Sequence, residues 1–181
     1  AGRWEWGNGG ETTSDMTIEP GHDGTAMRWT WHQGRLGGDS PGRAVITSTA
    51  MQFRTVYIGV RVRWSVPWTN HPCGANKILY WGSMEAREQL GWGPSQYYLN
   101  RRGNLIDLTL QHAQANGQSN VPSSSSARLA STRVDDGQWH RVEMVLDGNE
   151  SGQSNCRVRV WVDGVLNFDV GNLVCSTGYS R

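Results

Sequence analysis

The chain has 181 residues and a formal charge of +1 at pH 7. This balance creates no overall field that would attract nucleic acid or an anionic membrane, and no apolar run approaches the roughly 20 residues of a membrane helix. Twenty-three glycines and only 18% charged residues are typical of many turns rather than long helices. We therefore expect one domain over residues 1–181, with no nucleic-acid partner and no membrane insertion.

Alternation of apolar and polar residues predicts most of the chain as strands. The predicted strands are residues 26–32, 56–64, 77–81, 96–100, 105–110, 138–146, 156–162 and a segment that starts at Val165. The Gly-rich residues 33–43 and the Ser-rich residues 113–126 predict surface loops. Residues 83–90 alone favour a helical turn or two. About nine strands with turns between them indicate two packed antiparallel sheets.

The clearest local signal is Asp163-Gly164, which lies between two alternating apolar segments. An Asp-Gly pair at this position predicts a two-residue hairpin turn, because Gly tolerates the positive φ that the turn requires. The preceding strands each have one aliphatic face, formed by Val142, Met144, Leu146, Val158, Val160 and Val162. Their other face carries Arg141, Glu143, Arg157, Arg159 and Trp161.

Cysteines 73, 156 and 175 allow at most one internal disulfide. Cys156 begins one hairpin strand and Cys175 follows its partner strand, so Cys156–Cys175 is the pairing we expect first. The chain begins at Ala1 rather than Met, which fits either a secreted protein whose signal was removed or loss of the initiator Met. We expect an extracellular location, or the surface of a larger particle. No Cys or His spacing typical of a metal site is present.

Four stretches together resemble one family. Residues 57–65 read YIGVRVRWS, residues 71–79 read HPCGANKIL, residues 137–143 read GQWHRVE, and residues 158–165 read VRVWVDGV. In this order they are similar to the bacterial secreted members of the concanavalin A-like lectin/glucanase superfamily, which includes polysaccharide lyases and LamG-like domains. The resemblance covers about residues 57–170 and implies an all-β jelly-roll sandwich of two antiparallel sheets. It leaves the function open, since this fold serves lectins, glycanases, lyases and structural domains.

Relatives in that family continue further past the hairpin and close the sandwich with a last strand. This chain stops at Arg181, which predicts an open sheet edge that a second copy or a larger assembly would cover. An edge strand from residues 1–20, or a truncated chain, would explain the same feature.

Catalysis has little support among the residues, and we expect no catalytic residue and no enzyme activity. Glycanases of this family place acidic residues at alternate strand positions, whereas Asp135 and Asp136 are adjacent, and Glu85 and Glu88 have helical spacing. A polysaccharide lyase remains an alternative, because it needs a Tyr or His base and cations that neutralise a uronate. Its candidate parts are His32, His112, His140, Tyr57, Tyr80, Tyr97 and Tyr98, with Arg28, Arg61, Arg63, Arg141 and Arg159.

Carbohydrate binding requires fewer specific groups than catalysis does, and we expect it as the function. If they share one non-core sheet face, eight residues would form a basic groove with an aromatic platform: Arg28, His32, Arg61, Arg63, Arg141, Glu143, Arg159 and Trp161. Such a groove suits an acidic polysaccharide, because Arg binds carboxylate or sulfate with two hydrogen bonds. The same residues could instead pair across strands and cover the sheet in a structural or assembly subunit. We expect no cofactor; calcium at Asp15, Asp23 or Asp163 is the one metal alternative.

Overall fold

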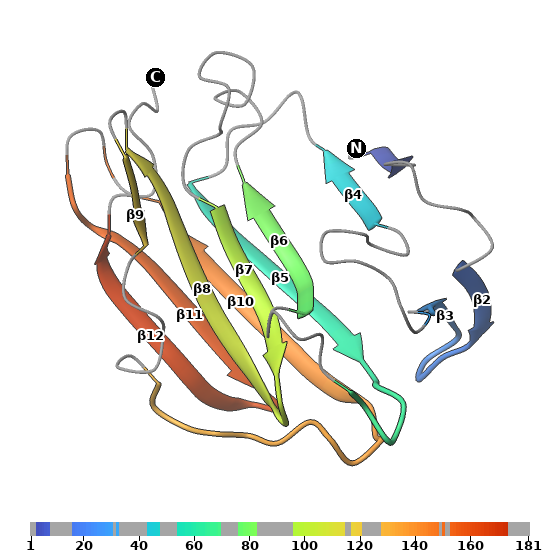
Figure 1. The fold of residues 1–181 in the computed structure, drawn as a ribbon. Helices are drawn as coiled ribbons and strands as arrows, with labels where there is room; N and C mark the ends of the chain where they lie inside the picture. The colour runs from blue at the N-terminus through green and yellow to red at the C-terminus, as the bar shows by residue number, and fades with distance from the viewer. Residues whose placement is uncertain are drawn as a thin grey trace. The chain divides into compact units, whose positions relative to one another are not determined.

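The computed structural model describes residues 3–7, 16–30, 32, 43–47, 54–69, 76–82, 96–114, 117–120, 128–148, 150 and 153–173. These residues form twelve strands in four open antiparallel sheets, without a helix or a closed barrel (Figure 1). In this part of the chain, therefore, no helix could cross a membrane. The chain divides into two compact units, residues 1–52 and 53–181.

The first unit contains two small sheets. β1 (Arg3–Gly7) pairs with β4 (Arg43–Thr47), and β2 (Met16–Pro20) pairs with β3 (Thr25–Trp29). β1, β2 and β4 are not among the predicted strands; β1 and β2 lie within residues 1–20, where an edge strand was the alternative, but they pair with β4 and β3 in separate two-stranded sheets. β3 ends at Trp29, so the strand predicted over residues 26–32 is shorter than expected.

The second unit contains two four-stranded sheets. The first has the order β12-β11-β10-β5, formed by β5 (Thr55–Val62), β10 (His140–Asp147), β11 (Cys156–Val162) and β12 (Val165–Leu173). The second has the order β6-β7-β8-β9, formed by β6 (Asn76–Gly82), β7 (Gln96–Arg102), β8 (Leu105–Gln114) and β9 (Gly117–Asn120). In Figure 1 the yellow-green strands β7 and β8 lie over the orange-red strands β10 to β12.

The predicted loop at residues 113–126 is wrong over its first part. β8 continues to Gln114, and β9 pairs back on it from Gln111↔Asn120 to Gln114↔Gly117. Polar and Ser-rich composition pointed to a loop, but an antiparallel ladder is held by main-chain hydrogen bonds and tolerates polar side chains. The helical turn predicted at residues 83–90 lies outside the described residues.

Both four-stranded sheets contribute side chains to one buried apolar cluster. Leu99, Ile106 and Leu108 come from the second sheet. The first sheet supplies Val142, Met144, Leu146, Val158, Val160, Val162 and Phe168. The predicted aliphatic face of β10 and β11 is thus confirmed, and alternation with a period of two is what buries it. Trp64, which follows β5, belongs to the same cluster and is 8% exposed.

The turn between β11 and β12 has the predicted conformation. Asp163 and Gly164 both have positive φ, at 52° and 80°, and the strands pair from Val162↔Val165 onward. Cys156 is buried at the start of β11 and is disulfide-bonded. Cys73 and Cys175 both lie outside the described residues, so the pairing with Cys175 stays a prediction.

Residues 128–134 form isolated bridges to the edge strand β12 of the first sheet and to the first residue of β8 in the second. Arg128 forms an isolated bridge with Phe168 of β12, and Arg133 forms one with Leu105 of β8. The Arg128 guanidinium stacks 4.6 Å from the Phe168 ring and donates to Ile106 O and Asp107 Oδ1, both at 3.1 Å. This segment therefore ties the first sheet to the second.

Candidate functional site

The face of the first sheet that points away from the core carries polar and aromatic side chains in cross-strand register. Arg61 lies opposite Arg141, Gly59 opposite Glu143, and Glu143 opposite Trp161. Tyr57 and Arg159 both lie opposite Val145. We call Tyr57, Arg61, Arg141, Glu143, Arg159 and Trp161 the sheet-face cluster.

Tyr57 is held over the sheet by its neighbours. Its hydroxyl donates to Glu143 Oε1 at 2.5 Å and accepts from Arg141 Nη2 at 3.1 Å. A Cβ on Gly59 would lie only 2.8 Å from the Tyr57 hydroxyl and 3.3 Å from two ring carbons, so the ring occupies the space above a residue without a side chain. The side chain is still 55% exposed. The result is a positioned aromatic ring that solvent can reach.

Arg141 is the central cation of the cluster. It also donates to Glu143 Oε1 at 2.8 Å. The hydrogen bond with Tyr57 and the charge of Glu143 raise the pKa of Arg141 above its ordinary value. Arg61 lies directly opposite on β5. Two like charges in facing strand positions repel each other, and the Glu143 carboxylate compensates the charge of Arg141.

Arg159 extends the cluster across β11. It donates to Asp147 Oδ2 at 2.8 Å, and its guanidinium lies 5.7 Å from the centre of the Trp161 ring. Beside it, Arg157 forms a bidentate pair with Asp169, with distances of 2.6 and 2.5 Å. Hydrogen bonding to Arg157 lowers the pKa of Asp169. Ion pairs of this kind are the cross-strand pairs expected if the face belongs to a structural or assembly subunit.

Arginines are in excess over carboxylates on this face. Among the described residues that point outward from the first sheet, Arg61, Arg63, Arg141, Arg157 and Arg159 outnumber Glu143, Asp147 and Asp169. Arg63 follows β5 and stacks 5.0 Å from the centre of the Trp139 ring. The face is therefore cationic among the described residues, with three aromatic rings, those of Tyr57, Trp139 and Trp161, among its charges.

Six of the eight predicted binding residues belong to or directly follow the strands of this sheet: Arg61, Arg63, Arg141, Glu143, Arg159 and Trp161. The expectation that all eight share one sheet is wrong for the other two. Arg28 lies on β3, in the separate β2–β3 sheet, 3.4 Å from Glu19. His32 lies beyond the end of β3 and is exposed. Local alternation cannot indicate which sheet a strand joins.

The contacts of His140 indicate a structural role. Its Nδ1 lies 2.7 Å from Asp163 Oδ2 and its Nε2 lies 2.9 Å from Asp136 Oδ1, with the side chain only 7% exposed. Burial by itself would lower the pKa of His140, but the hydrogen bonds that Asp163 and Asp136 accept from its ring outweigh burial and raise that pKa. Asp163 Oδ1 also accepts the Arg141 backbone N–H at 2.8 Å. His140 thus links the hairpin turn to the start of β10.

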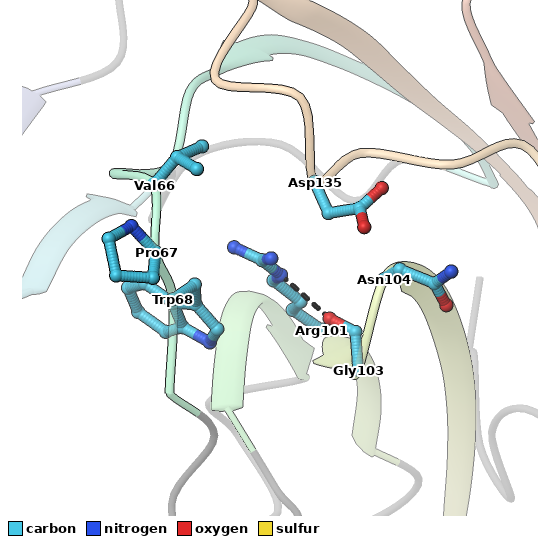
Figure 2. A pocket seen from close by; sticks show the side chains of 7 residues that line it. All are labelled: Val66, Pro67, Trp68, Arg101, Gly103, Asn104 and Asp135. Atoms are coloured by element: carbon cyan, nitrogen blue, oxygen red, sulfur yellow. Dashed lines mark hydrogen bonds between the residues drawn. The ribbon is translucent and has the colours of Figure 1, made fainter.

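A pocket of about 310 Å³ lies in the second unit, outside the cluster (Figure 2). It is lined by Val66, Pro67, Trp68, Arg101, Gly103, Asn104 and Asp135, and we call it the Arg101 pocket. Arg101 is 2% exposed, and its guanidinium lies 5.0 Å from the Trp64 ring and 4.9 Å from the Trp68 ring. Its Nε donates to Gly103 O at 3.0 Å. Burial lowers the pKa of Arg101, and the charge of Asp135 partly opposes this.

The predicted binding site omitted Tyr57, Gly59 and every residue of the Arg101 pocket. Tyr57 and Gly59 are two positions apart on a predicted strand, so their shared face could have been inferred. That Glu143 lies beside them could not, because it depends on the register between β5 and β10. The pocket joins three segments that are far apart in sequence, and no local pattern indicates it.

Within the described residues, no group of three or more His, Cys, Asp or Glu is arranged to hold a metal ion. Of the calcium candidates, Asp163 contacts His140 and Asp23 lies 2.8 Å from His22, while Asp15 lies outside the described residues. Comparison of the whole chain with protein-family models, with curated proteins and with solved structures gives no match.

Proposed function

We propose that this protein binds an acidic polysaccharide, without cleaving it, on the exposed face of the β12-β11-β10-β5 sheet. The proposal includes a concanavalin A-like jelly roll as the arrangement of the strands, and a location outside the cell. The observation that carries it is the Arg61–Arg141 pair next to the positioned ring of Tyr57.

The aromatic part of the argument rests on Tyr57. A pyranose ring stacks on an aromatic face, and binding costs less entropy when that face is already fixed. The contacts to Glu143, Arg141 and Gly59 fix the Tyr57 ring before any ligand arrives. Trp161, opposite Glu143 on the next strand, adds a second ring at a neighbouring position.

The ionic part rests on the two facing arginines. A carboxylate or sulfate placed between Arg61 and Arg141 would accept charge-assisted hydrogen bonds from both side chains. A neutral glycan offers no charge to either guanidinium group. We therefore favour a uronate- or sulfate-bearing polymer over a neutral one.

A lyase is the second candidate, because a phenol and a guanidinium lie side by side at Tyr57 and Arg141. Proton abstraction by Tyr57 would require the phenolate as the base. In this structure the Tyr57 hydroxyl donates to Glu143 Oε1 and accepts from Arg141 Nη2, so it is already hydrogen-bonded within the cluster. These contacts support binding rather than cleavage.

Affinity electrophoresis in gels that contain alginate, polygalacturonate or neutral dextran tests the proposal. The wild type should be retarded by the two acidic polymers, less so at high salt, and not by dextran. Arg61→Ala, Trp161→Ala and Tyr57→Phe should each weaken retardation, by about tenfold in Kd for the Ala variants, which is about 1.4 kcal/mol.

Arg54→Ala is the matched control. Arg54 is exposed and pairs with Glu150 at 3.1 Å before the start of β5, so the same loss of charge away from the cluster should leave retardation unchanged. If Arg54→Ala and Arg61→Ala weakened retardation equally, the interaction would depend on the overall charge of the protein rather than on the sheet-face cluster. A folded oligomer without retardation would favour the assembly role, and an ultraviolet-absorbing unsaturated product would establish the lyase.

A further inference from the structure

The Arg101 pocket is built from three chain segments of the second unit. A cis peptide bond joins Val66 to Pro67 on one wall, which continues into Trp68. Gly103 and Asn104 form the turn between β7 and β8, and Asp135 comes from the segment before β10. Figure 2 shows the Arg101 side chain extending between Pro67 and Trp68 on one side and Asp135 on the other.

Main-chain contacts hold these walls together. The Val134 N–H donates to Asn104 O at 2.9 Å, which fixes the Asp135 segment against the β7–β8 turn. Gly137 has φ 77°, and a Cβ there would lie 3.1 Å from Val66 Cγ2. Gly137 therefore lets the same segment approach the opposite wall closely. The pocket is preformed in the folded chain.

Three charged side chains of the described residues, Arg101, Arg133 and Asp135, lie at or beside the pocket. Asp135 is already engaged by Arg133, whose Nε and Nη2 donate to its two carboxylate oxygens at 3.0 and 2.7 Å. In the part of the chain that the structure describes, two guanidinium groups and one carboxylate thus lie near the cavity. The Arg101 guanidinium lies within about 5 Å of two indole rings, and the low polarity there strengthens its attraction for an anion.

We propose that the Arg101 pocket is a separate binding site for a ring-sized molecule that bears a carboxylate, such as a single hexuronate. The carboxylate pairs with Arg101, the ring lies against Trp68, and the amide of Asn104 bonds to a hydroxyl. The volume of about 310 Å³ is at the lower end of the range of about 300–1,000 Å³ for ligand pockets. The site does not depend on polysaccharide binding at the sheet-face cluster.

Titrations followed by ¹H–¹⁵N correlation NMR test this site residue by residue. Glucuronate, glucose and cyclohexanecarboxylate are added separately to the ¹⁵N-labelled protein. Glucuronate should cause saturable shifts of the Gly103 and Asn104 amides and of the Trp68 indole N–H, and glucose should not. Shifts with glucuronate alone assign a sugar acid; equal shifts with cyclohexanecarboxylate support the carboxylate site but assign an apolar acid as its ligand.

Variants with opposite expected signs sharpen the test. Trp68→Ala should weaken glucuronate binding about tenfold, and Asp135→Asn should strengthen it about threefold because a like charge is removed. Arg101→Gln should abolish it; if that buried substitution prevents folding, the other two variants still decide. Tyr57→Phe and Arg61→Ala should leave these titrations unchanged, and Trp68→Ala should leave polysaccharide retardation unchanged.

Three results would overturn the proposal. One is equal binding of glucose and glucuronate, which removes the role of the carboxylate. Another is the absence of shifts at Gly103, Asn104 and Trp68 at high millimolar glucuronate. The third is weaker glucuronate binding in Asp135→Asn. If glucuronate does not bind the pocket but polysaccharides still retard the protein, only the pocket proposal is overturned. If glucuronate binds but no polysaccharide retards the protein, only the sheet-face proposal is overturned.

Discussion

Asn167 and Thr132 exchange two hydrogen bonds across the edge of β12: the Thr132 N–H donates to Asn167 Oδ1 at 3.1 Å, and Asn167 Nδ2 donates to Thr132 Oγ1 at 3.0 Å. Nδ2 also donates to Val165 O at 2.8 Å. Asn167 is 1% exposed, so this one amide satisfies three groups of the chain where water does not reach. The contact holds the 128–134 segment on the sheet.

Asn167→Ala should lower the free energy of unfolding by about 2–3 kcal/mol, because it leaves buried polar groups without partners. Urea unfolding measures this directly. Gln153→Ala, at an exposed position, is the control and should change stability by less than about 0.5 kcal/mol. Equal effects of the two substitutions would show that the amide does not hold the segment.

The His140 imidazole should titrate above its ordinary pKa of about 6.5, because Asp163 and Asp136 both accept hydrogen bonds from its charged form. Stability from this group is complete below about pH 6.5 and is lost as the pH rises through the higher folded pKa. NMR of the ring C–H signals measures that pKa. Asp163→Asn should lower it toward 6.5, and a wild-type pKa at or below 6.5 would contradict the two-carboxylate arrangement.

Gly164→Ala should cost about 1–2 kcal/mol, since φ at this position is 80° and a Cβ disfavours such a conformation. Gly171→Ala is the matched control. A Cβ at Gly171 would meet only Arg157 Cγ, at 3.9 Å, so its effect on urea unfolding should stay within about 0.5 kcal/mol. Similar losses for both substitutions would mean that the hairpin turn is not what Gly164 supports.

The parts of the fold that followed from the sequence are those governed by nearby residues. The Asp163-Gly164 turn depends on one glycine, and the aliphatic faces of β10 and β11 depend on alternation with a period of two. Both can be identified directly in the sequence. β9 was missed because its polar residues contribute main-chain hydrogen bonds rather than a buried face. β1 was missed because short strands near a terminus have few alternating positions to count.

The candidate site was predicted less completely than the strands. Arg61, Arg141 and Glu143 were placed on the outer face from alternation alone, but the facing of Arg61 and Arg141 depends on the register between β5 and β10. Arg28 was included because its own strand alternates correctly, although that strand pairs with β2. Register and sheet membership arise from tertiary packing, which a single sequence does not display.

Residues 128–134 also have a consequence for aggregation. Bare edges of sheets recruit strands from other molecules, and this one stretch lies along part of the edge of β8 and part of the edge of β12. Its local detachment would uncover both edges in a single event. At these two places, protection against strand pairing with another molecule therefore depends on how firmly one short stretch stays in place, whereas the edge strands β5, β6 and β9 do not depend on it.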